Sequence, residues 1–331
     1  MKILIIKLDK IGDYILFRNF LKPVRKKYPR AEITLLGNEV YKNLVDEKDD
    51  KFINKFLWAN QKSFLTKNDY RMKYSIGLNK KYDLIIHPTY SRDRIVDGFI
   101  GSLKSDMKIS FKGNCANQNK KEKKFSDLVY DRLIETNKLH DFDKNRDFFE
   151  KVLKMNLGEI ILDLDYKKYK SGLIGEREYI VVMQGAGSRF RRYSKRKIRK
   201  IVQFIKGNYK LDVCLVGSKR DEKVAKEIKE KVGYNVLDLT GETDLNELVD
   251  LIGNAKFMIS GDTCGLHIAV ATKTPIICIA TGIVYGRFIP YPKEYENVYP
   301  IFPPFWFKDF YGIINLINPK EIINKIKFLL K

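Results

Sequence analysis

The segment YIVVMQGAGS at residues 179–188 decides the fold class of this 331-residue chain. Its first half, Tyr179–Met183, is an unbroken apolar run rich in β-branched residues, which predicts a strand buried on both faces. A glycine-containing loop follows, and residues 194–207 then form an expected basic helix. Strand, loop and helix in this order make one βα unit of a parallel sheet.

Similar units continue on both sides of this segment. Downstream, we expect strands at 212–216, 235–239, 257–260 and 275–280 and helices at 221–232, 245–252 and 264–271. Upstream, we expect a strand at 3–8, one helix that ends before Pro29, and strands at 33–36 and 83–87. Residues 41–80 and 90–160 are Lys-rich and weakly periodic, so the pattern places little there.

The pattern predicts an α/β protein built from two doubly wound, Rossmann-like domains. We expect an N-terminal domain at 1–165, a C-terminal domain at 176–318, and a final helix at 319–331, for which packing back on the N-terminal domain is one option. Residues 286–304 are rich in proline and predict an irregular loop.

The composition excludes several classes of protein. Apolar residues make up 44% of the chain, too many for a disordered protein. No apolar stretch is long enough for a membrane span, and the N-terminus does not resemble a signal peptide, so we expect a cytoplasmic protein. The four cysteines are scattered, which indicates neither a disulfide framework nor a zinc site. The net charge of +22 favours acidic partners, or reflects a Lys-rich surface alone.

The strongest candidate site is residues 259–269, ISGDTCGLHIA. A strand ends there, an acidic turn follows, and a helix begins at once. The open amides and dipole of a helix N-terminus favour phosphate oxygens. Thr263 adds a hydroxyl, and Asp262 suits a sugar hydroxyl. The alternative is that Asp262 is only an N-cap and His267 a core histidine.

The loop Gly185–Ser188 and the arginine at 191 form a second candidate. Glycines allow close approach of a ligand, and a guanidinium pairs with phosphate in a fork geometry. Eight of the twelve residues at 189–200 are cationic. The alternatives for this basic cluster are a solvated helix face or a nucleic-acid surface.

The third candidate is KLDKIGDY at residues 7–14. The motif GxGxxG is absent, which disfavours a dinucleotide site. Asp13 lies near a helix start, where the dipole favours a carboxylate that acts as a general base or simply as a cap. Asp163 and Asp165 form a DxD pattern without a strand end nearby, so we predict no metal site.

Together these segments resemble the heptosyltransferase family of glycosyltransferases, glycosyltransferase family 9. The family's Lys/Arg-x-Ser-Ser-Ile-Gly-Asp corresponds to residues 7–13, and its Lys-x-Trp-Pro corresponds to 191–194. Its Leu-Thr-Gly-x-Thr-x-Leu corresponds to 239–245, and its Asp-Ser/Thr-Gly-Pro-x-His corresponds to 262–267.

The resemblance implies a GT-B fold, with two Rossmann-like domains facing each other across a cleft, and inverting, metal-independent sugar transfer without a cofactor. It implies Asp13 as the base for the acceptor hydroxyl. The implied donor-binding residues are Gly187, Ser188, Arg191, Thr240, Asp262, Thr263, Cys264, Gly265 and His267. The expected acceptor-binding residues are Lys7, Lys10 and Gly12.

The resemblance also implies the partners. These are a nucleotide-diphosphate sugar such as ADP-heptose, an acidic glycolipid of the lipopolysaccharide core, and the anionic inner face of the plasma membrane, with no nucleic acid. Departures such as Cys264-Gly265 for Gly-Pro leave the sugar and base open. The alternatives are a nucleic-acid-binding protein that uses residues 189–200, or an inactive family member that binds a nucleotide sugar.

Overall fold

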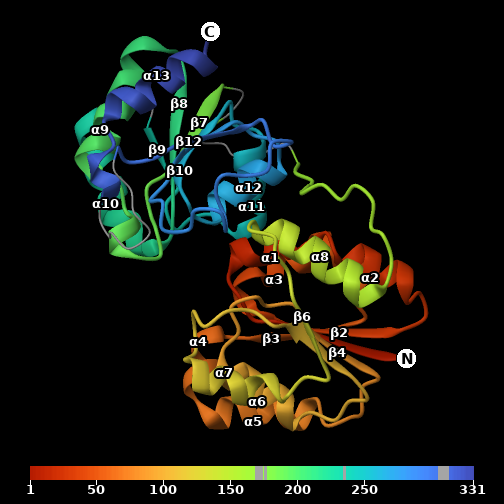
Figure 1. Ribbon diagram of the computed structural model, residues 1–331. Helices are drawn as coiled ribbons and strands as arrows, with labels where there is room; N and C mark the ends of the chain where they lie inside the picture. The colour runs from red at the N-terminus through yellow and green to blue at the C-terminus, as the bar shows by residue number, and fades with distance from the viewer. Residues whose placement is uncertain (168–173, 175–176, 234–235, 305–312) are drawn as a thin grey trace. The chain divides into compact units, whose positions relative to one another are not determined.

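The computed structural model describes residues 1–167, 174, 177–233, 236–304 and 313–331 (Figure 1). The chain divides into two units, Met1–Ile161 and Leu162–Lys331. Each unit contains one six-stranded parallel sheet with helices on both faces. The predicted α/β class and its Rossmann-like pattern are therefore confirmed. Most of the segment between the two expected domains, including Gly172 and Gly175, lies outside the described residues.

The N-terminal sheet has the strand order β3-β2-β1-β4-β5-β6. Its strands are β1 (Lys2–Lys7), β2 (Glu32–Asn38), β3 (Lys55–Ala59), β4 (Leu84–His87), β5 (Lys108–Phe111) and β6 (Arg132–Ile134). Ile3, Leu4, Ile5 and Ile6 are completely buried, because β1 lies between two neighbouring strands and beneath helices on both faces.

The N-terminal helices are α1 (Ile11–Arg18), α2 (Leu21–Lys27), α3 (Lys42–Lys48), α4 (Gln61–Thr66), α5 (Asn68–Gly77), α6 (Arg94–Ser102), α7 (Lys120–Asp127) and α8 (Asp141–Leu153). The single helix expected before Pro29 is two helices, α1 and α2. Pro23 explains the break, because it has no amide for the carbonyl of Asn19 and its ring would clash with that carbonyl.

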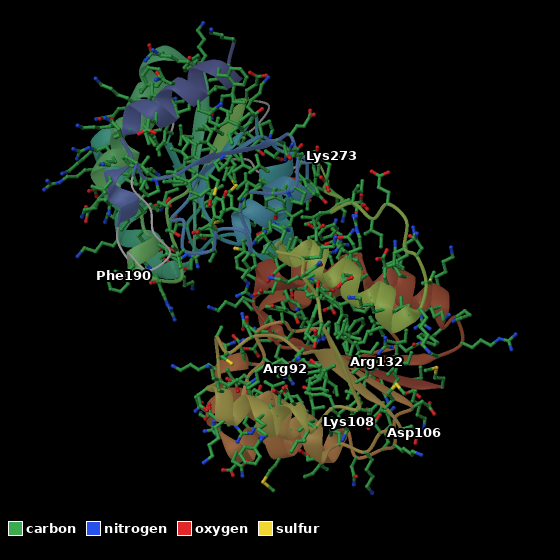
Figure 2. All side chains as sticks on the ribbon, viewed as in Figure 1. Arg92, Asp106, Lys108, Arg132, Phe190 and Lys273 are labelled. Carbon is green, nitrogen blue, oxygen red and sulfur yellow. The ribbon has the colours of Figure 1, made fainter. Side chains whose placement is uncertain are left out.

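One buried polar cluster lies inside the N-terminal unit (Figure 2). Arg92 is completely buried and lies 3.5 Å from the Asp97 carboxylate. Asp97 accepts a hydrogen bond from the Tyr130 hydroxyl at 2.5 Å and lies 3.5 Å from His87 Nδ1. The cluster joins the end of β4 to α6, so it fixes the loop that follows β4.

The C-terminal sheet has the strand order β12-β11-β10-β7-β8-β9. Its strands are β7 (Tyr179–Met183), β8 (Asp212–Val216), β9 (Val236–Asp238), β10 (Met258–Gly261), β11 (Ile276–Ile279) and β12 (Val298–Ile301). Strand β12 corrects the expectation of a wholly irregular loop at 286–304. Pro300 is tolerated there because β12 lies at the edge of the sheet, where a missing amide costs little.

The C-terminal helices are α9 (Lys195–Asn208), α10 (Glu222–Val232), α11 (Leu245–Gly253), α12 (Cys264–Ala271) and α13 (Pro319–Leu329). Figure 1 shows α9, α10 and α13 on one face of the sheet and α11 and α12 on the other. Ile322 and Ile326 of α13 are fully buried in the same core as Ile201 of α9. The apolar face of the final helix is therefore used within its own unit.

Candidate functional site

An ion pair lies at the carboxyl edge of the C-terminal sheet. Arg191 ends the short helix η3 (Arg189–Arg191), and Asp262 follows β10. Arg191 Nε and Nη2 donate to Asp262 Oδ1 at 3.1 and 2.9 Å, and Nη2 also donates to the Asp262 backbone carbonyl. The Asp262 side chain is completely buried, whereas 27% of the Arg191 side chain is exposed. The arginine is thus held from inside the unit and keeps one part accessible.

The opening of helix α12 follows this pair. Its N-cap is Thr263, so the interpretation of Asp262 as the N-cap is wrong. The Thr263 amide donates to the Gly261 carbonyl at 2.9 Å, so this amide is already used within the chain. Burial raises the pKa of the Cys264 thiol, and the amides of Cys264 and Gly265 oppose that shift because they stabilise the thiolate. The same two amides would favour an anionic oxygen of a ligand.

The loop after β7 contains a glycine that the packing requires. A Cβ atom on Gly185 would lie 2.3 Å from Asp221 Oδ2. Gly187 is exposed, with open space where its Cβ would be, and Ser188 is half-buried. Gln184 is buried, and neither its Oε1 nor its Nε2 has a hydrogen-bond partner among the described residues. Polar groups without partners at a strand end are available to a ligand.

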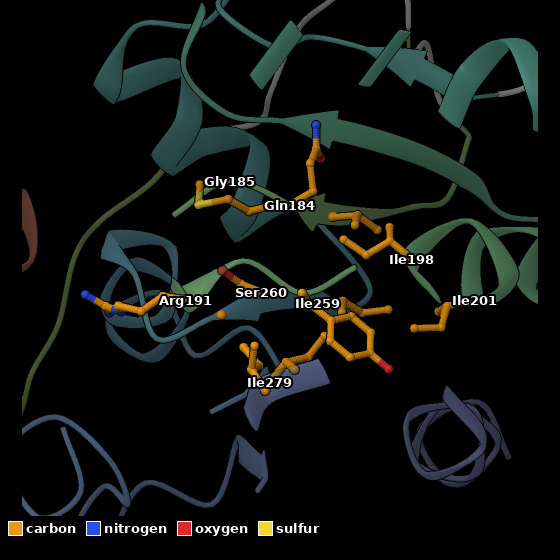
Figure 3. A pocket seen from close by; sticks show the side chains of 13 residues that line it. Gln184, Gly185, Arg191, Ile198, Ile201, Ile259, Ser260 and Ile279 are labelled. Atoms are coloured by element: carbon orange, nitrogen blue, oxygen red, sulfur yellow. The ribbon is translucent and has the colours of Figure 1, made fainter. Parts of the chain in front are cut away.

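A small pocket borders these strand ends. Figure 3 shows Ile198 and Ile201 of α9 on one side of it and Arg191 on the opposite side, with Gln184 and Ser260 between them. Apolar walls with a few polar groups are typical of small-molecule sites. The pocket therefore adds to the candidate site at this edge of the sheet.

Two further predicted donor residues are buried. The Thr240 amide donates to Asp238 Oδ1 at 3.1 Å, and the Thr240 hydroxyl has no partner within the described part of the chain. His267 is 4% exposed and its Nδ1 lies 2.5 Å from the Tyr291 hydroxyl, with the Phe288 ring against it. Among the described residues the Thr240 hydroxyl thus stays without a partner, while His267 has the contacts of a core histidine.

In the N-terminal unit, Lys7 and Asp9 organise the loop between β1 and α1. Lys7 Nζ lies 2.8 Å from Asp9 Oδ2 and donates to the Pro88 carbonyl at 2.9 Å. The Thr89 hydroxyl donates to Asp9 at 2.6 Å. Burial alone would raise the pKa of Asp9, but the charge and hydrogen bond of Lys7 and the bond from Thr89 together hold it below its usual value. Lys7, predicted as acceptor-binding, is 4% exposed and is used inside the loop.

Asp13 lies in the first turn of α1, where the helix dipole favours a carboxylate. It is half-buried, as is Gly12, and the N-cap residue Lys10 is exposed. Burial raises the pKa of Tyr41 well above its usual value, and the carboxylates of Asp9 and Asp13 raise it further. The predicted base therefore lies in a half-buried helix turn.

Two further features of the chain concern metal ions and membranes. Across the described ranges, no three His, Cys, Asp or Glu side chains come together in a way that would hold a metal ion. Asp163 and Asp165 of the DxD pattern are both exposed. In the part of the chain that the structure describes, no helix is both long and apolar enough to span a membrane.

Comparison with known families decides the classification. Residues 78–302 match the model of glycosyltransferase family 9 (heptosyltransferase). The chain belongs to glycosyltransferase family 9. The resemblance inferred from the motifs is therefore confirmed.

Two curated proteins are similar to parts of this family 9 chain. One is lipooligosaccharide heptosyltransferase 2 of Haemophilus influenzae, 33% identical over 123 residues, which is 34% of this chain and 34% of that protein. The other is lipooligosaccharide heptosyltransferase 2 of Haemophilus ducreyi, 37% identical over 82 residues, which is 24% of this chain and 23% of that protein. The matches thus span about a third or less of the length of these relatives.

Solved structures resemble the whole family 9 chain. A glycosyl transferase family 9 protein from Veillonella parvula aligns with a TM-score of 0.77 at 13% identity, covering 99% of this chain and 97% of the other. The E. coli heptosyltransferase WaaC with ADP-2-deoxy-2-fluoro heptose has a TM-score of 0.75 at 16% identity and covers 99% of both chains. The E. coli ADP-heptose lps heptosyltransferase II has a TM-score of 0.72 at 17% identity, covering 100% of this chain and 98% of the other. These similarities confirm the predicted GT-B fold.

The structure gives a reason for one departure from the family 9 motif. Where the motif has proline, this chain has Gly265, and a Cβ there would lie 2.6 Å from Met258 Cε and 2.9 Å from Met183 Sδ. The two methionines therefore fill the space that a side chain at this position would need.

Four of the eight cations in the basic cluster at 189–200 contact other parts of the chain. In addition to Arg191, Arg192 donates to the Ala186 carbonyl at 3.3 Å, and Lys195 lies 2.5 Å from Glu227. Lys197 donates to the carbonyls of residues 315 and 317 at 2.6 and 2.8 Å. These contacts stabilise the loop and α9, so the cluster is not simply a row of free cations for nucleic acid.

Sequence reasoning missed three residues that organise the site. Asp221 fits against Gly185, the Thr281 hydroxyl donates to Asp262 Oδ2 at 2.9 Å, and Gln184 contributes its unpaired amide. The position of Gln184 at a strand end was visible in the sequence. Asp221 and Thr281 come from separate βα units, and no local pattern links them to the loop or to the 262–267 motif.

Proposed function

We propose that this chain is a glycosyltransferase that moves a sugar, most simply a heptose, from a nucleoside diphosphate to a hydroxyl of a lipopolysaccharide-core acceptor. Family membership supports the reaction class, and both curated relatives are named as heptosyltransferases. A solved structural neighbour contains an ADP-linked heptose analogue, which supports ADP-heptose as the donor. The observation that carries the proposal is the placement of Arg191 beside the opening of α12.

In this proposal the C-terminal unit binds the diphosphate. Negative charge grows on the diphosphate as its bond to the anomeric carbon breaks, and fixed donors that are already aimed at it lower the barrier. Arg191 supplies the cation, and the amides of Cys264 and Gly265 supply the dipole end of α12. Gly187 and Ser188 allow the close approach of the loop. These groups perform the task of a divalent metal, so transfer is expected to be metal-independent.

Asp13 is proposed as the general base. Its carboxylate takes the proton of the acceptor hydroxyl, and the freed oxygen forms a bond to the anomeric carbon from the face opposite the leaving diphosphate. Attack from that face inverts the configuration of the sugar. Lys10 and Gly12 in the same turn are proposed to contact the acceptor, and Lys7 supports them by holding Asp9.

The charge of the chain supports an acidic acceptor at a membrane surface. A net charge of +22 attracts an anionic glycolipid and the anionic lipids around it. We place the reaction at the cytoplasmic face of the inner membrane, with the chain bound peripherally. Sedimentation with vesicles that contain anionic lipid tests this location: binding should fall steeply as salt rises.

A transfer assay with ADP-heptose and a heptose-free core acceptor tests the reaction. Wild type should release ADP and form product, and Asp13→Asn should lower turnover by about 10²-fold or more while donor binding is retained. Asp69→Asn is the matched control, since Asp69 is an exposed aspartate in the first turn of α5. Near-normal turnover by Asp13→Asn would contradict the assignment of the base. Donor binding by wild type without product would favour the inactive family member.

A further inference from the structure

The strongest unassigned feature is the way Asp262 is enclosed. Its Oδ1 accepts two hydrogen bonds from Arg191, from Nε at 3.1 Å and from Nη2 at 2.9 Å, and its backbone carbonyl accepts a further bond from Nη2. Three bonds from two nitrogens hold the guanidinium in one plane and one position. A lysine ammonium has no second nitrogen, so this grip depends on arginine at 191.

The second carboxylate oxygen is also occupied. Asp262 Oδ2 accepts a hydrogen bond from the Thr281 hydroxyl at 2.9 Å, and Thr281 itself is only 2% exposed. The Thr281 hydroxyl oxygen also accepts from the Ile283 amide at 3.3 Å. Both oxygens of Asp262 therefore have donors from the chain, and the carboxylate is sealed from solvent.

This geometry does not suit a carboxylate that contacts a ligand. A sugar hydroxyl would have to displace either Arg191 or Thr281 to reach an oxygen of Asp262, and the displaced donor would lose a charge-assisted bond. The exposed part of the pair belongs to Arg191. Nη1 lies outside the bonds to Asp262, so it is the nitrogen that a ligand can use.

We propose that Asp262, together with Thr281, is a positioning residue that holds the Arg191 guanidinium for the diphosphate, rather than a residue that contacts the donor sugar. The inference rests on the proposed function, because it assumes a nucleoside diphosphate at Arg191. It replaces the role implied for Asp262 by the family motif. The physical gain is that Arg191 loses little rotamer freedom when the diphosphate binds, because that freedom is already lost in the free protein.

Two other roles for Asp262 predict different results. If Asp262 contacts the sugar, its removal weakens binding of the nucleotide sugar but not of the nucleoside diphosphate. If Asp262 competes with phosphate for Arg191, its removal strengthens binding of the diphosphate. The positioning role alone predicts that the affinities for the diphosphate and for the nucleotide sugar fall by the same factor. The affinity for the nucleoside, which has no phosphate, should not change.

Isothermal titration separates these roles. Wild type is first titrated with ADP, GDP, UDP and CDP, and the diphosphate that binds most tightly is used together with its nucleoside and a sugar nucleotide of the same base. Asp262→Ala should weaken the diphosphate and the sugar nucleotide alike, by about tenfold or more. Asp262→Asn, which keeps an acceptor for Arg191, should recover part of that loss. Unchanged affinity for the nucleoside shows that the variant is folded.

A second variant and a double-mutant cycle complete the test. Thr281→Val should weaken the diphosphate in the same direction, by a smaller factor, whereas Thr272→Val, which removes another buried hydroxyl of this unit, should not. In an Arg191→Lys background, Asp262→Ala should weaken diphosphate binding by less than about threefold, because its effect acts through the two nitrogens of the Arg191 guanidinium.

The failures are distinguishable. If wild type binds none of the diphosphates, the proposed function fails and the positioning role fails with it. The positioning role alone is overturned if wild type binds a diphosphate and any of three results is seen. Asp262→Ala would lower the affinity for the sugar nucleotide only, or raise the affinity for the diphosphate, or lower that affinity by the same factor when residue 191 is lysine.

Discussion

Replacing Gly185 with alanine would place a methyl group where the Asp221 carboxylate already lies. The new Cβ would be 2.3 Å from Oδ2, 2.6 Å from Cγ and 2.8 Å from Oδ1. Asp221 cannot easily move, because its Oδ2 accepts bonds from the Ser218 amide at 3.1 Å and hydroxyl at 2.8 Å. The bond from the Ser218 amide is part of the capping box of the turn before α10. The methyl group therefore displaces either this box or the loop that carries Arg191.

The expected cost follows from these two effects. Forcing an extra carbon into packed space costs about 1–3 kcal/mol. Losing the cap adds about 1 kcal/mol. We expect Gly185→Ala to lower the free energy of unfolding of the C-terminal unit by about 2–4 kcal/mol. For a unit of this size, each kcal/mol lowers Tm by about 2–4 °C.

The matched control is Gly187→Ala in the same loop. Gly187 is exposed, and its added Cβ would meet open space, so we expect a change within about 0.5 kcal/mol. Thermal and denaturant unfolding give the free energy of unfolding of both variants. Titration with ADP shows whether the loop that carries Arg191 still supports nucleotide binding. Equal stability of the two variants would refute the reasoning, because only the contact with Asp221 distinguishes them.

Two further predictions concern buried polar groups. Gln184→Met removes an amide without a partner among the described residues, so the unfolding free energy should stay level or rise by about 1 kcal/mol in denaturant titrations; a loss above about 2 kcal/mol would mean that the amide is paired. Burial alone would raise the pKa of Asp97, but His87, Arg92 and Tyr130 together lower it below its usual value of 3.8. The ionised Asp97 therefore stabilises the folded state fully above pH 3.8. This stabilisation is lost as the pH falls through the lower pKa of the folded state. Asp97→Asn should therefore cost about 3–5 kcal/mol at pH 7 and progressively less in acid, and a cost that does not shrink in acid would contradict the assigned cause.

The C-terminal unit was predictable because its elements have strong local signals. Strands such as β7 are continuous apolar runs, and α11 begins with a capping box in which Asp244 and Glu247 bond each other's backbone amides. These patterns place strands and helices within one or two residues of their observed bounds. Strand β12 was missed because its proline argues against a strand unless the strand lies at an edge, which is a property of the whole sheet.

The N-terminal unit was less predictable between residues 41 and 160. Helix α5 contains no buried residue, so it carries no apolar stripe that would mark it as a helix. The strand β6 has only three residues. Both elements form because neighbouring strands and helices bind them, and that information is not local.

The candidate site was predictable in its positions but not in its contacts. Strand ends and glycines marked residues 185–188, 191 and 259–269 as candidates. The bonding of Asp262 to Arg191 and Thr281 could not be inferred, because it joins three loops from distant parts of the sequence. The same is true of the hydrogen bond between His267 and Tyr291.

The central claim is that Arg191 and the opening of α12 bind a nucleoside diphosphate without a metal ion. Calorimetric titration of ADP into the chain, with chelator and then with excess Mg²⁺, measures this directly. The dissociation constant should be the same within about twofold in both conditions, and Arg191→Met should weaken it by about tenfold or more in both. Binding that is seen only with Mg²⁺, or that is indifferent to Arg191→Met, would contradict the claim.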